Sequence, residues 1–282
     1  MKQIVVGVDF SKTSLLALQY ALNMARHTDS DVLMVNVQKH LDHGVPLSTD
    51  ERRGPEDVVQ QFESLVEKHR GDIPGQLNYA VRDGKVHDEI ANQAKYSDAW
   101  LVVVGAHGLS GFEEFWMGTD SYRVVATSMC PVITLRKGYD VMRPMKKVVI
   151  PIDSTLETTQ KVPFTIDLAK RFNAQVHVLS LYSAMMSGIK EKVDGSSHET
   201  MRQVELAGLE LVQENAVSDN ITLAAIEYAK QVDADLISIM TEQEFAPRNI
   251  FLGPYAQQMV NRSPIPVLSM HTKVLMRDQH FG

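Results

Sequence analysis

Cysteine is nearly absent from this chain, which has only Cys130 in 282 residues. A single cysteine excludes an internal disulfide and is typical of proteins in a reducing compartment. No apolar run approaches the roughly 20 residues needed to span a bilayer. The first residues, MKQIVVGVDF, do not form a signal peptide pattern, because Asp9 interrupts a short apolar run. We therefore expect a cytoplasmic protein with no membrane partner.

An excess of positive charge is also missing. The chain has 28 Lys and Arg against 35 Asp and Glu, a net charge of −7, and no basic block, so it lacks the electrostatic footprint of a nucleic-acid-binding protein. The phosphate loop of P-loop ATPases and the G-x-S-x-G pattern of hydrolases are absent too. We expect no nucleic-acid partner and assign no catalytic residue and no metal ligand. Slow ATP hydrolysis is the enzymatic alternative left open.

The chain does contain an internal repeat. KQIVVGVDF at 2–10 returns as KVVIPIDS at 147–154, and SMCPVITL at 128–135 returns as SPIPVLSM at 263–270. Two copies of one domain explain this, and the length fits about 150 residues per domain. We place the domains at residues 1–138 and 145–272, with a linker at 137–144 and a tail at 273–282.

Apolar, β-branched strands alternate with amphipathic helices in each half, which predicts parallel sheets covered on both faces. The expected fold is α/β, with two tandem open-sheet domains, each a five-stranded, mainly parallel, Rossmann-like sheet. In the second half, Ser154 and Glu157 have the spacing of a capping box and predict a helix that begins there. A helix over 197–206 and a strand over 209–214 follow.

The stretch GAHGLSGFEEFWMGT, residues 105–119, follows the apolar run 100–104 and reads Gly-x-x-Gly, nine residues, Gly-Thr. Glycines allow the backbone to approach a ligand, and the N-terminus of the next helix offers N–H groups to an anion, so the pattern favours phosphate binding. The alternative is a plain strand-to-helix turn without a ligand. Asp9, which follows the first strand, either accepts hydrogen bonds from sugar hydroxyls or caps the next helix.

These residues resemble the universal stress proteins in their tandem form. The resemblance implies that Gly105, Gly108, Gly118 and Thr119 hold phosphates, with the adenine and ribose between Asp9 and Val37; His107 and Asp120 adjoin these positions and complete the predicted nucleotide-binding set. It also implies an ATP-binding stress-response regulator, with ADP or AMP as alternative nucleotides. Glu113, Glu114 and Asp120 bring negative charge near the phosphates, which magnesium would offset. The competing function is an interaction scaffold with a vestigial site.

The second half departs from the glycine pattern. The slots of Gly105, Gly108, Gly118 and Thr119 hold Met240, Gln243, Gly253 and Pro254. Pro254 lacks both the hydroxyl and the N–H, so we predict that only the first half binds nucleotide. Single-domain members of the family pair through their last strands, so we expect 132–135 and 265–269 to meet within the chain as an intramolecular pseudo-dimer. A regulatory protein partner is expected, and association of two chains stays open.

Overall fold

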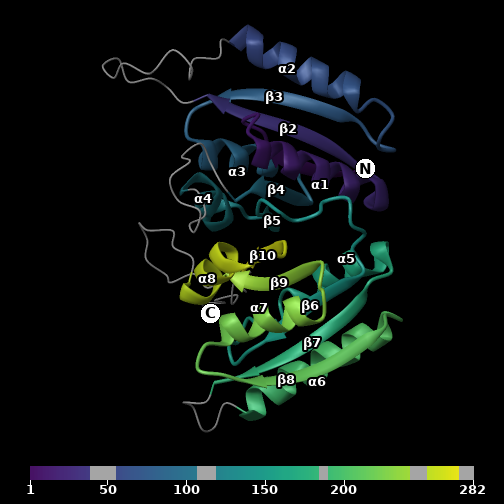
Figure 1. The fold of residues 1–282 in the computed structure, drawn as a ribbon, viewed down its shortest axis with the longest axis vertical. Coiled ribbons are helices and arrows are strands. Elements are labelled where there is room, and N and C mark those ends of the chain that lie inside the picture. Colours follow the sequence, from purple (N-terminus) through teal and green to yellow (C-terminus); the bar gives the residue numbers. More distant parts are fainter. Residues whose placement is uncertain (39–54, 107–118, 184–189, 242–252, 273–282) are drawn as a thin grey trace, which may run out of the picture.

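The computed structural model describes residues 1–38, 55–106, 119–183, 190–241 and 253–272 (Figure 1). The first half consists of β1 (Lys2–Gly7), α1 (Lys12–Thr28), β2 (Ser30–Gln38), α2 (Pro55–Lys68), β3 (Leu77–Asp83), α3 (Val86–Tyr96), β4 (Leu101–Gly105), α4 (Thr119–Thr127) and β5 (Val132–Leu135). The second half consists of β6 (Lys147–Ile152), α5 (Val162–Phe172), β7 (Gln175–Tyr182), α6 (Lys190–Leu206), β8 (Leu211–Val217), α7 (Ile221–Gln231), β9 (Leu236–Thr241), α8 (Pro254–Arg262) and β10 (Val267–His271).

One ten-stranded sheet runs through both halves in the order β3-β2-β1-β4-β5-β10-β9-β6-β7-β8. Neighbouring strands are parallel within each half, and only the central pair, β5 and β10, is antiparallel. Each half is therefore an open five-stranded parallel sheet. The predicted α/β fold class is confirmed.

Strand alternation divides the core into two layers, because successive side chains point to opposite faces of the sheet. In β1, Ile4 and Val6 belong to the layer covered by α1, α2, α5 and α6, while Val5 belongs to the layer covered by α3, α4, α7 and α8. Both layers continue from one half into the other. Among the described helices, none is long and apolar enough to cross a membrane.

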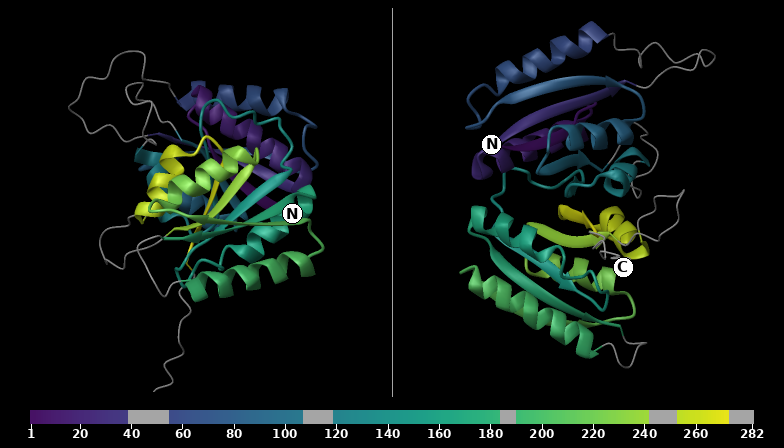
Figure 2. Two further views of the ribbon diagram at one scale, coloured as in Figure 1. Left: turned by 60° about the horizontal axis from the view of Figure 1, so that its bottom comes forward. Right: turned by 180° about the vertical axis from the view of Figure 1, so that it is seen from behind.

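The two halves meet at the antiparallel pair, in which Thr134 faces Val267 and Val132 faces Ser269. This confirms the expected intramolecular pairing of the last strands, and it covers an edge of each sheet that would otherwise be open to other chains. Figures 1 and 2 show the halves stacked along the long axis of the molecule with this seam between them.

Two reciprocal contacts reinforce the seam. Arg136, directly after β5, donates from Nη1 to the carbonyl of Asn261 in α8. His271, at the end of β10, contacts the carbonyl of Val125 in α4 through Nε2 at 2.5 Å. Both acceptors lie in the last turn of a helix, where carbonyls lack intrahelical partners. Each half therefore caps the final helix of the other.

The predicted linker, residues 137–144, is packed against both halves. Val141 is 3% exposed, and its carbonyl accepts a hydrogen bond from Asn23 of α1 at 3.1 Å. Arg143 pairs with the buried carboxylate of Asp235, which also accepts hydrogen bonds from two backbone N–H groups at the start of the second half. The connection therefore helps to fix the halves relative to one another.

Two predicted elements of the second half differ from the structure. The helix predicted over 197–206 begins seven residues earlier, at Lys190. Tertiary contacts hold its first turns in spite of Gly195: Val193 is fully buried, and the Tyr182 hydroxyl donates to Asp194 at 2.6 Å. The strand predicted over 209–214 is shifted, because Leu209 still hydrogen-bonds back to the end of α6, and β8 runs from Leu211 to Val217.

Candidate functional site

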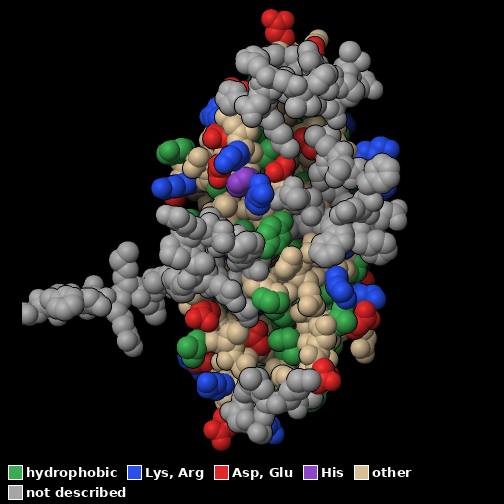
Figure 3. Space-filling view, turned by 90° about the vertical axis from the view of Figure 1, so that its left-hand side faces the viewer, with side chains coloured by type: hydrophobic (Ala, Val, Ile, Leu, Met, Phe, Trp, Pro, Cys, Tyr) green, Lys and Arg blue, Asp and Glu red, His purple; other side chains and the backbone are tan. Residues whose placement is uncertain are grey.

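The candidate site lies at the carboxyl ends of β1, β2 and β4. The strand order β3-β2-β1-β4-β5 reverses direction between β1 and β4, and open α/β sheets bind ligands in the crevice at such a switch point. The strand ends of both halves lie on the left in Figure 1 and face the viewer in Figure 3. Figure 3 also shows Lys and Arg side chains beside a histidine in the upper half of this face.

Asp9 follows β1 at a sharp turn. Its Oδ1 accepts a hydrogen bond from the Ser11 N–H at 2.9 Å, and Phe10 between them has a positive φ of 62°. Such a conformation is rare for a bulky residue and turns the chain abruptly from strand into helix. The N-cap of α1 is Ser11, whose side chain accepts from the Ser14 N–H at 3.2 Å. The alternative in which Asp9 is the helix cap is therefore wrong; Asp9 shapes the turn before it.

Val37 lies near the end of β2, the strand that pairs with β1. Gly7 pairs with Val35 in the parallel register, alternation places residues 5 and 7 with 33, 35 and 37 on one face, and Asp9 follows two residues after Gly7. Val37 is half-buried and packs against the core layer under α3 and α4. The structure thus brings the two residues predicted to flank the adenosine to neighbouring strand ends.

Gly105 ends β4 and faces α1 instead. A Cβ on Gly105 would lie 2.8 Å from the backbone oxygen of Thr13 and 2.7 Å from its methyl group. The glycine is therefore required for α1 to begin this close to β4, whether or not a ligand binds. The Gly105 carbonyl also accepts a hydrogen bond from the Ser121 hydroxyl at 2.5 Å, which ties the first turn of α4 to the end of β4.

The other predicted phosphate contacts are only in part described. Thr119 is the first residue of α4, as expected, and Asp120 follows in its first turn. His107, Gly108 and Gly118 lie outside the described residues, as do Glu113 and Glu114. The helix that would receive a phosphate therefore begins where the sequence predicts, next to the ends of β1 and β4.

The second half repeats the turn made by Asp9 but not the helix start directly after it. Asp153 Oδ1 accepts from the Thr155 N–H at 2.9 Å and from its hydroxyl at 2.6 Å, matching Asp9 and Ser11. However, α5 begins only at Val162, and the predicted capping box at Ser154 and Glu157 is wrong.

Met240 and Pro163 both fit the late start of α5, since a proline is tolerated in the first turn of a helix and not in its interior. Met240 stands in the slot of Gly105 and is 7% exposed. A helix from Thr155 would bring Glu157 to the place that Thr13 occupies in the first half, where even a Cβ on residue 105 has no room. The chain instead passes through turns from 156 to 161. Gln243 is outside the described residues, and Pro254 is the first residue of α8.

Lys161 ends these turns and is buried, with 2% of its surface exposed. Its ammonium donates to the carbonyl and the hydroxyl of Thr158. Among the described residues, no carboxylate forms an ion pair with it. Burial lowers the pKa of Lys161 from 10.5 to about 8, and Asp153 opposes that shift. The same position in the first half holds Ala17, which is fully buried.

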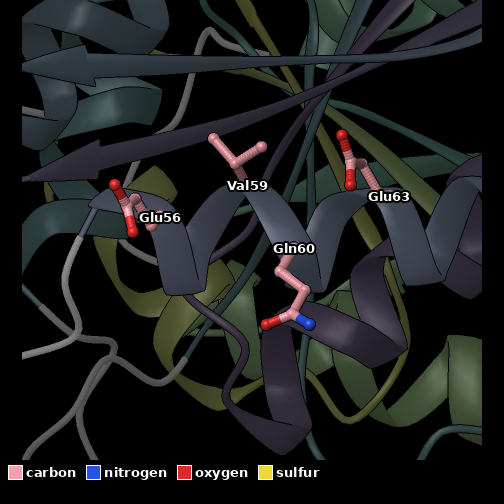
Figure 4. A pocket seen from close by; sticks show the side chains of 4 residues that line it. All are labelled: Glu56, Val59, Gln60 and Glu63. Carbon is pink, nitrogen blue, oxygen red and sulfur yellow. The ribbon is translucent and has the colours of Figure 1, made fainter.

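Sequence reasoning missed His87, in the first turn of α3. Its side chain is 13% exposed, and its Nδ1 is enclosed without a hydrogen-bond partner among the described residues. No motif includes His87, and only the state of this ring nitrogen in the fold draws attention to it. A shallow hollow on α2 is lined by Glu56, Val59, Gln60 and Glu63; Figure 4 shows that Val59 and Gln60 point in different directions from this one helix. That hollow shares no residue with the candidate site.

The profile of the universal stress protein family matches residues 1–136 and again residues 144–271. This repeated α/β unit therefore has a known class: the chain belongs to the universal stress protein family, in a tandem form.

Two curated relatives match about half of the chain each. The chain is 26% identical over 151 residues to universal stress protein YxiE of Bacillus subtilis (strain 168), covering 48% of this chain and 98% of that protein. It is 27% identical over 142 residues to universal stress protein MJ0531 of Methanocaldococcus jannaschii, covering 48% of this chain and 82% of that protein.

Solved structures extend the likeness to nearly the whole chain. A universal stress protein from Archaeoglobus fulgidus DSM 4304 superposes with a TM-score of 0.75 at 15% identity, covering 96% of this chain and 98% of that one. A functionally unknown protein, PA1789, from Pseudomonas aeruginosa PAO1 superposes with a TM-score of 0.66 at 14% identity, covering 96% and 93%. At these identities the likeness shows the fold alone.

Proposed function

We propose that the first half binds an adenine nucleotide in the cytoplasm, that the second half does not, and that occupancy changes the contacts of this protein with a regulatory partner in a stress response. The observation that carries the proposal is the convergence of Asp9, Val37 and Gly105 at strand ends beside the switch point, next to the N-terminus of α4. Crevices of this kind are the usual ligand sites of open α/β sheets.

The chemistry of these groups suits a nucleoside phosphate. The Asp9 carboxylate would accept hydrogen bonds from sugar hydroxyls, and Val37 would cover one face of the base. The first turn of α4, from Thr119, offers backbone N–H groups and the positive end of a helix dipole to a phosphate. Each exposed contact of that kind is worth about 0.3 to 1 kcal/mol, so several must act together.

The identity of the nucleotide depends on the charge near the phosphates. Asp120 in the first turn of α4 repels a phosphate, and magnesium would offset that repulsion. We propose ATP as the ligand, with ADP and AMP as the alternatives in which fewer phosphates meet the acid. A magnesium ion would stabilise the triphosphate most, because the triphosphate carries the most negative charge.

Features of the second half argue against a nucleotide site there. Met240 fills the slot of Gly105, Pro254 takes the place of Thr119, and Lys161 with its turn occupies the space where α1 begins in the first half. A competing function, an interaction scaffold with a vestigial first site, is favoured by Asp120, because the acid weakens binding of any polyphosphate.

Calorimetric titration of the full chain with ATP, ADP and AMP, with and without magnesium, tests the proposal. Asp9→Asn keeps an oxygen that can accept from the Ser11 N–H but removes the charge. Asp153→Asn is its matched control, because Asp153 accepts from Thr155 in the same way.

We expect one nucleotide per chain and no change for Asp153→Asn. Binding to Asp9→Asn should be about 10- to 150-fold weaker, since losing a charged acceptor costs about 1.5 to 3 kcal/mol. Absence of binding in the unmodified chain would favour the scaffold. Two sites per chain, or equal effects of the two variants, would contradict the assignment to the first half.

A further inference from the structure

His87 carries a buried nitrogen that the fold leaves unsatisfied. Nδ1 of its ring is enclosed and has no hydrogen-bond partner among the described residues. Buried polar atoms are nearly always paired, so an unpaired one requires an explanation. One explanation is a ligand that supplies the missing partner.

His87 lies in the first turn of α3, on the side of the helix that packs against β1. Ile90, one turn later on the same face of α3, is 3% exposed, and its Cδ1 lies 2.9 Å from the place where a Cβ on Gly7 would stand. Residues three apart in a helix share a face, so His87 lies on the same side, one turn closer to the carboxyl ends of the strands. Val86, its neighbour in α3, packs against the same core layer as Val37.

Val37 packs on this same face of the sheet and Asp9 follows the neighbouring strand β1, whereas Gly105 faces α1. The space between Asp9 and Val37 is where the proposed function puts the adenosine. His87 therefore borders the base and not the phosphates. In the second half the equivalent residue is Thr222, at the same point of α7, which is 3% exposed and has no such unpaired atom within the described part of the chain.

The two ring nitrogens of His87 have different surroundings. Nε2 lies 3.5 Å from a carboxylate oxygen of Asp88, so a ring proton on Nε2 would face that carboxylate. A neutral ring with its proton on Nε2 has a lone pair on Nδ1, and Nδ1 then accepts a hydrogen bond and donates none. The matching group on an adenine is the exocyclic amino group, whereas hypoxanthine and guanine have a carbonyl oxygen at that position.

We propose that His87 is a specificity-determining residue of the first half, whose Nδ1 accepts a hydrogen bond from the exocyclic amino group of the base. This inference rests on the proposed function. It goes further in stating which atom of the chain distinguishes a 6-amino purine from a 6-oxo purine.

Titration of the full chain with AMP and with IMP tests the proposal, because the two differ at this amino group. His87→Asn puts a side-chain amide near the former position of Nδ1, and His87→Gln puts a side-chain amide near the former position of Nε2. His87→Leu has no polar group at either position. Thermal denaturation shows whether each variant is folded.

We expect the unmodified chain to prefer AMP over IMP by about tenfold, the effect of one desolvated hydrogen bond. His87→Asn should keep that preference, while His87→Gln and His87→Leu should lose it, mainly through weaker binding of AMP. If His87→Leu does not fold, the preference for AMP over IMP is compared between His87→Asn and His87→Gln, and that comparison tests the proposal.

An unchanged preference in His87→Gln and His87→Leu would overturn the role of His87 and leave the proposed function intact. Failure of the unmodified chain to bind any of ATP, AMP and IMP would overturn both. Equal binding of AMP and IMP by the unmodified chain would overturn the role of the amino group while the site itself stands.

Discussion

Replacing Lys161 by methionine is expected to stabilise the protein, because the ammonium is buried without an ion pair among the described residues. Burial lowers its pKa from 10.5 to about 8, a difference of about 2.5 units, and each unit corresponds to about 1.4 kcal/mol. The charged form therefore costs the folded state about 3 kcal/mol at pH 7. Methionine has a similar length and adapts to irregular space in a core.

Part of this gain is offset. The Thr158 carbonyl loses the hydrogen bond from the ammonium, which costs about 1 kcal/mol, whereas the Thr158 hydroxyl keeps its bond from the Asp153 N–H at 3.2 Å. We expect Lys161→Met to raise the free energy of unfolding by about 2 kcal/mol at pH 7. Lys170→Met, at an exposed lysine of the following helix, α5, should change it by less than about 0.5 kcal/mol.

The pH dependence gives an independent check. Between pH 8 and 10.5 the unfolded chain keeps the Lys161 proton that the folded chain has lost, so this group makes the stability of the unmodified protein rise with pH in that window. The variant lacks this rise, and the difference between the two proteins should shrink as pH increases.

Urea denaturation at pH 7, 8.5 and 10 measures both effects. A variant that is less stable than the unmodified chain by more than about 1 kcal/mol at pH 7 would refute the reasoning, because it would show that the charge has a compensating partner.

Two further changes test the packing of the site and of the connection between the halves. Gly105→Ala should lower the free energy of unfolding by about 1 to 3 kcal/mol in urea denaturation, because its Cβ meets the backbone of Thr13; unchanged stability would mean that α1 shifts at no cost. Arg143→Met should lower it by about 3 to 5 kcal/mol, because it leaves the buried carboxylate of Asp235 without its guanidinium, whereas Asp233→Ala removes an exposed partner of the same arginine and should cost less than about 1 kcal/mol. Equal costs for these two variants would contradict the distinction between buried and exposed partners.

The sequence predicts the sheet well because the repeat supplies each strand twice. The pairing of 132–135 with 265–269 follows from the family resemblance and is confirmed by the register of Thr134 and Val267. Elements whose ends depend on tertiary contacts are predicted less well. The first turns of α6 contain Gly195, and they are helical because Val193 is buried and Asp194 binds Tyr182.

The candidate site could also be predicted only in part from the sequence. Asp9, Val37 and Gly105 lie at or just after the ends of strands, so their arrival at one edge of the sheet could be expected. The packing role of Gly105 could not, because Thr13 is distant from it along the chain and only the fold brings them together. His87 has no motif around it, and nothing in the sequence indicates that one of its ring nitrogens is buried without a hydrogen-bond partner among the described residues.

The two halves differ at their switch points through a linked set of changes, not through separate losses. Glycine at residue 105 permits a helix that begins three residues after Asp9, while methionine at residue 240 is accompanied by a helix that begins nine residues after Asp153. The delayed helix places Lys161 in the core where the first half has a buried alanine. A glycine at residue 240 alone would therefore leave Lys161 and the turns before α5 in place. For this reason we expect Met240→Gly to lose stability without gaining a nucleotide, which a calorimetric titration with ATP would check.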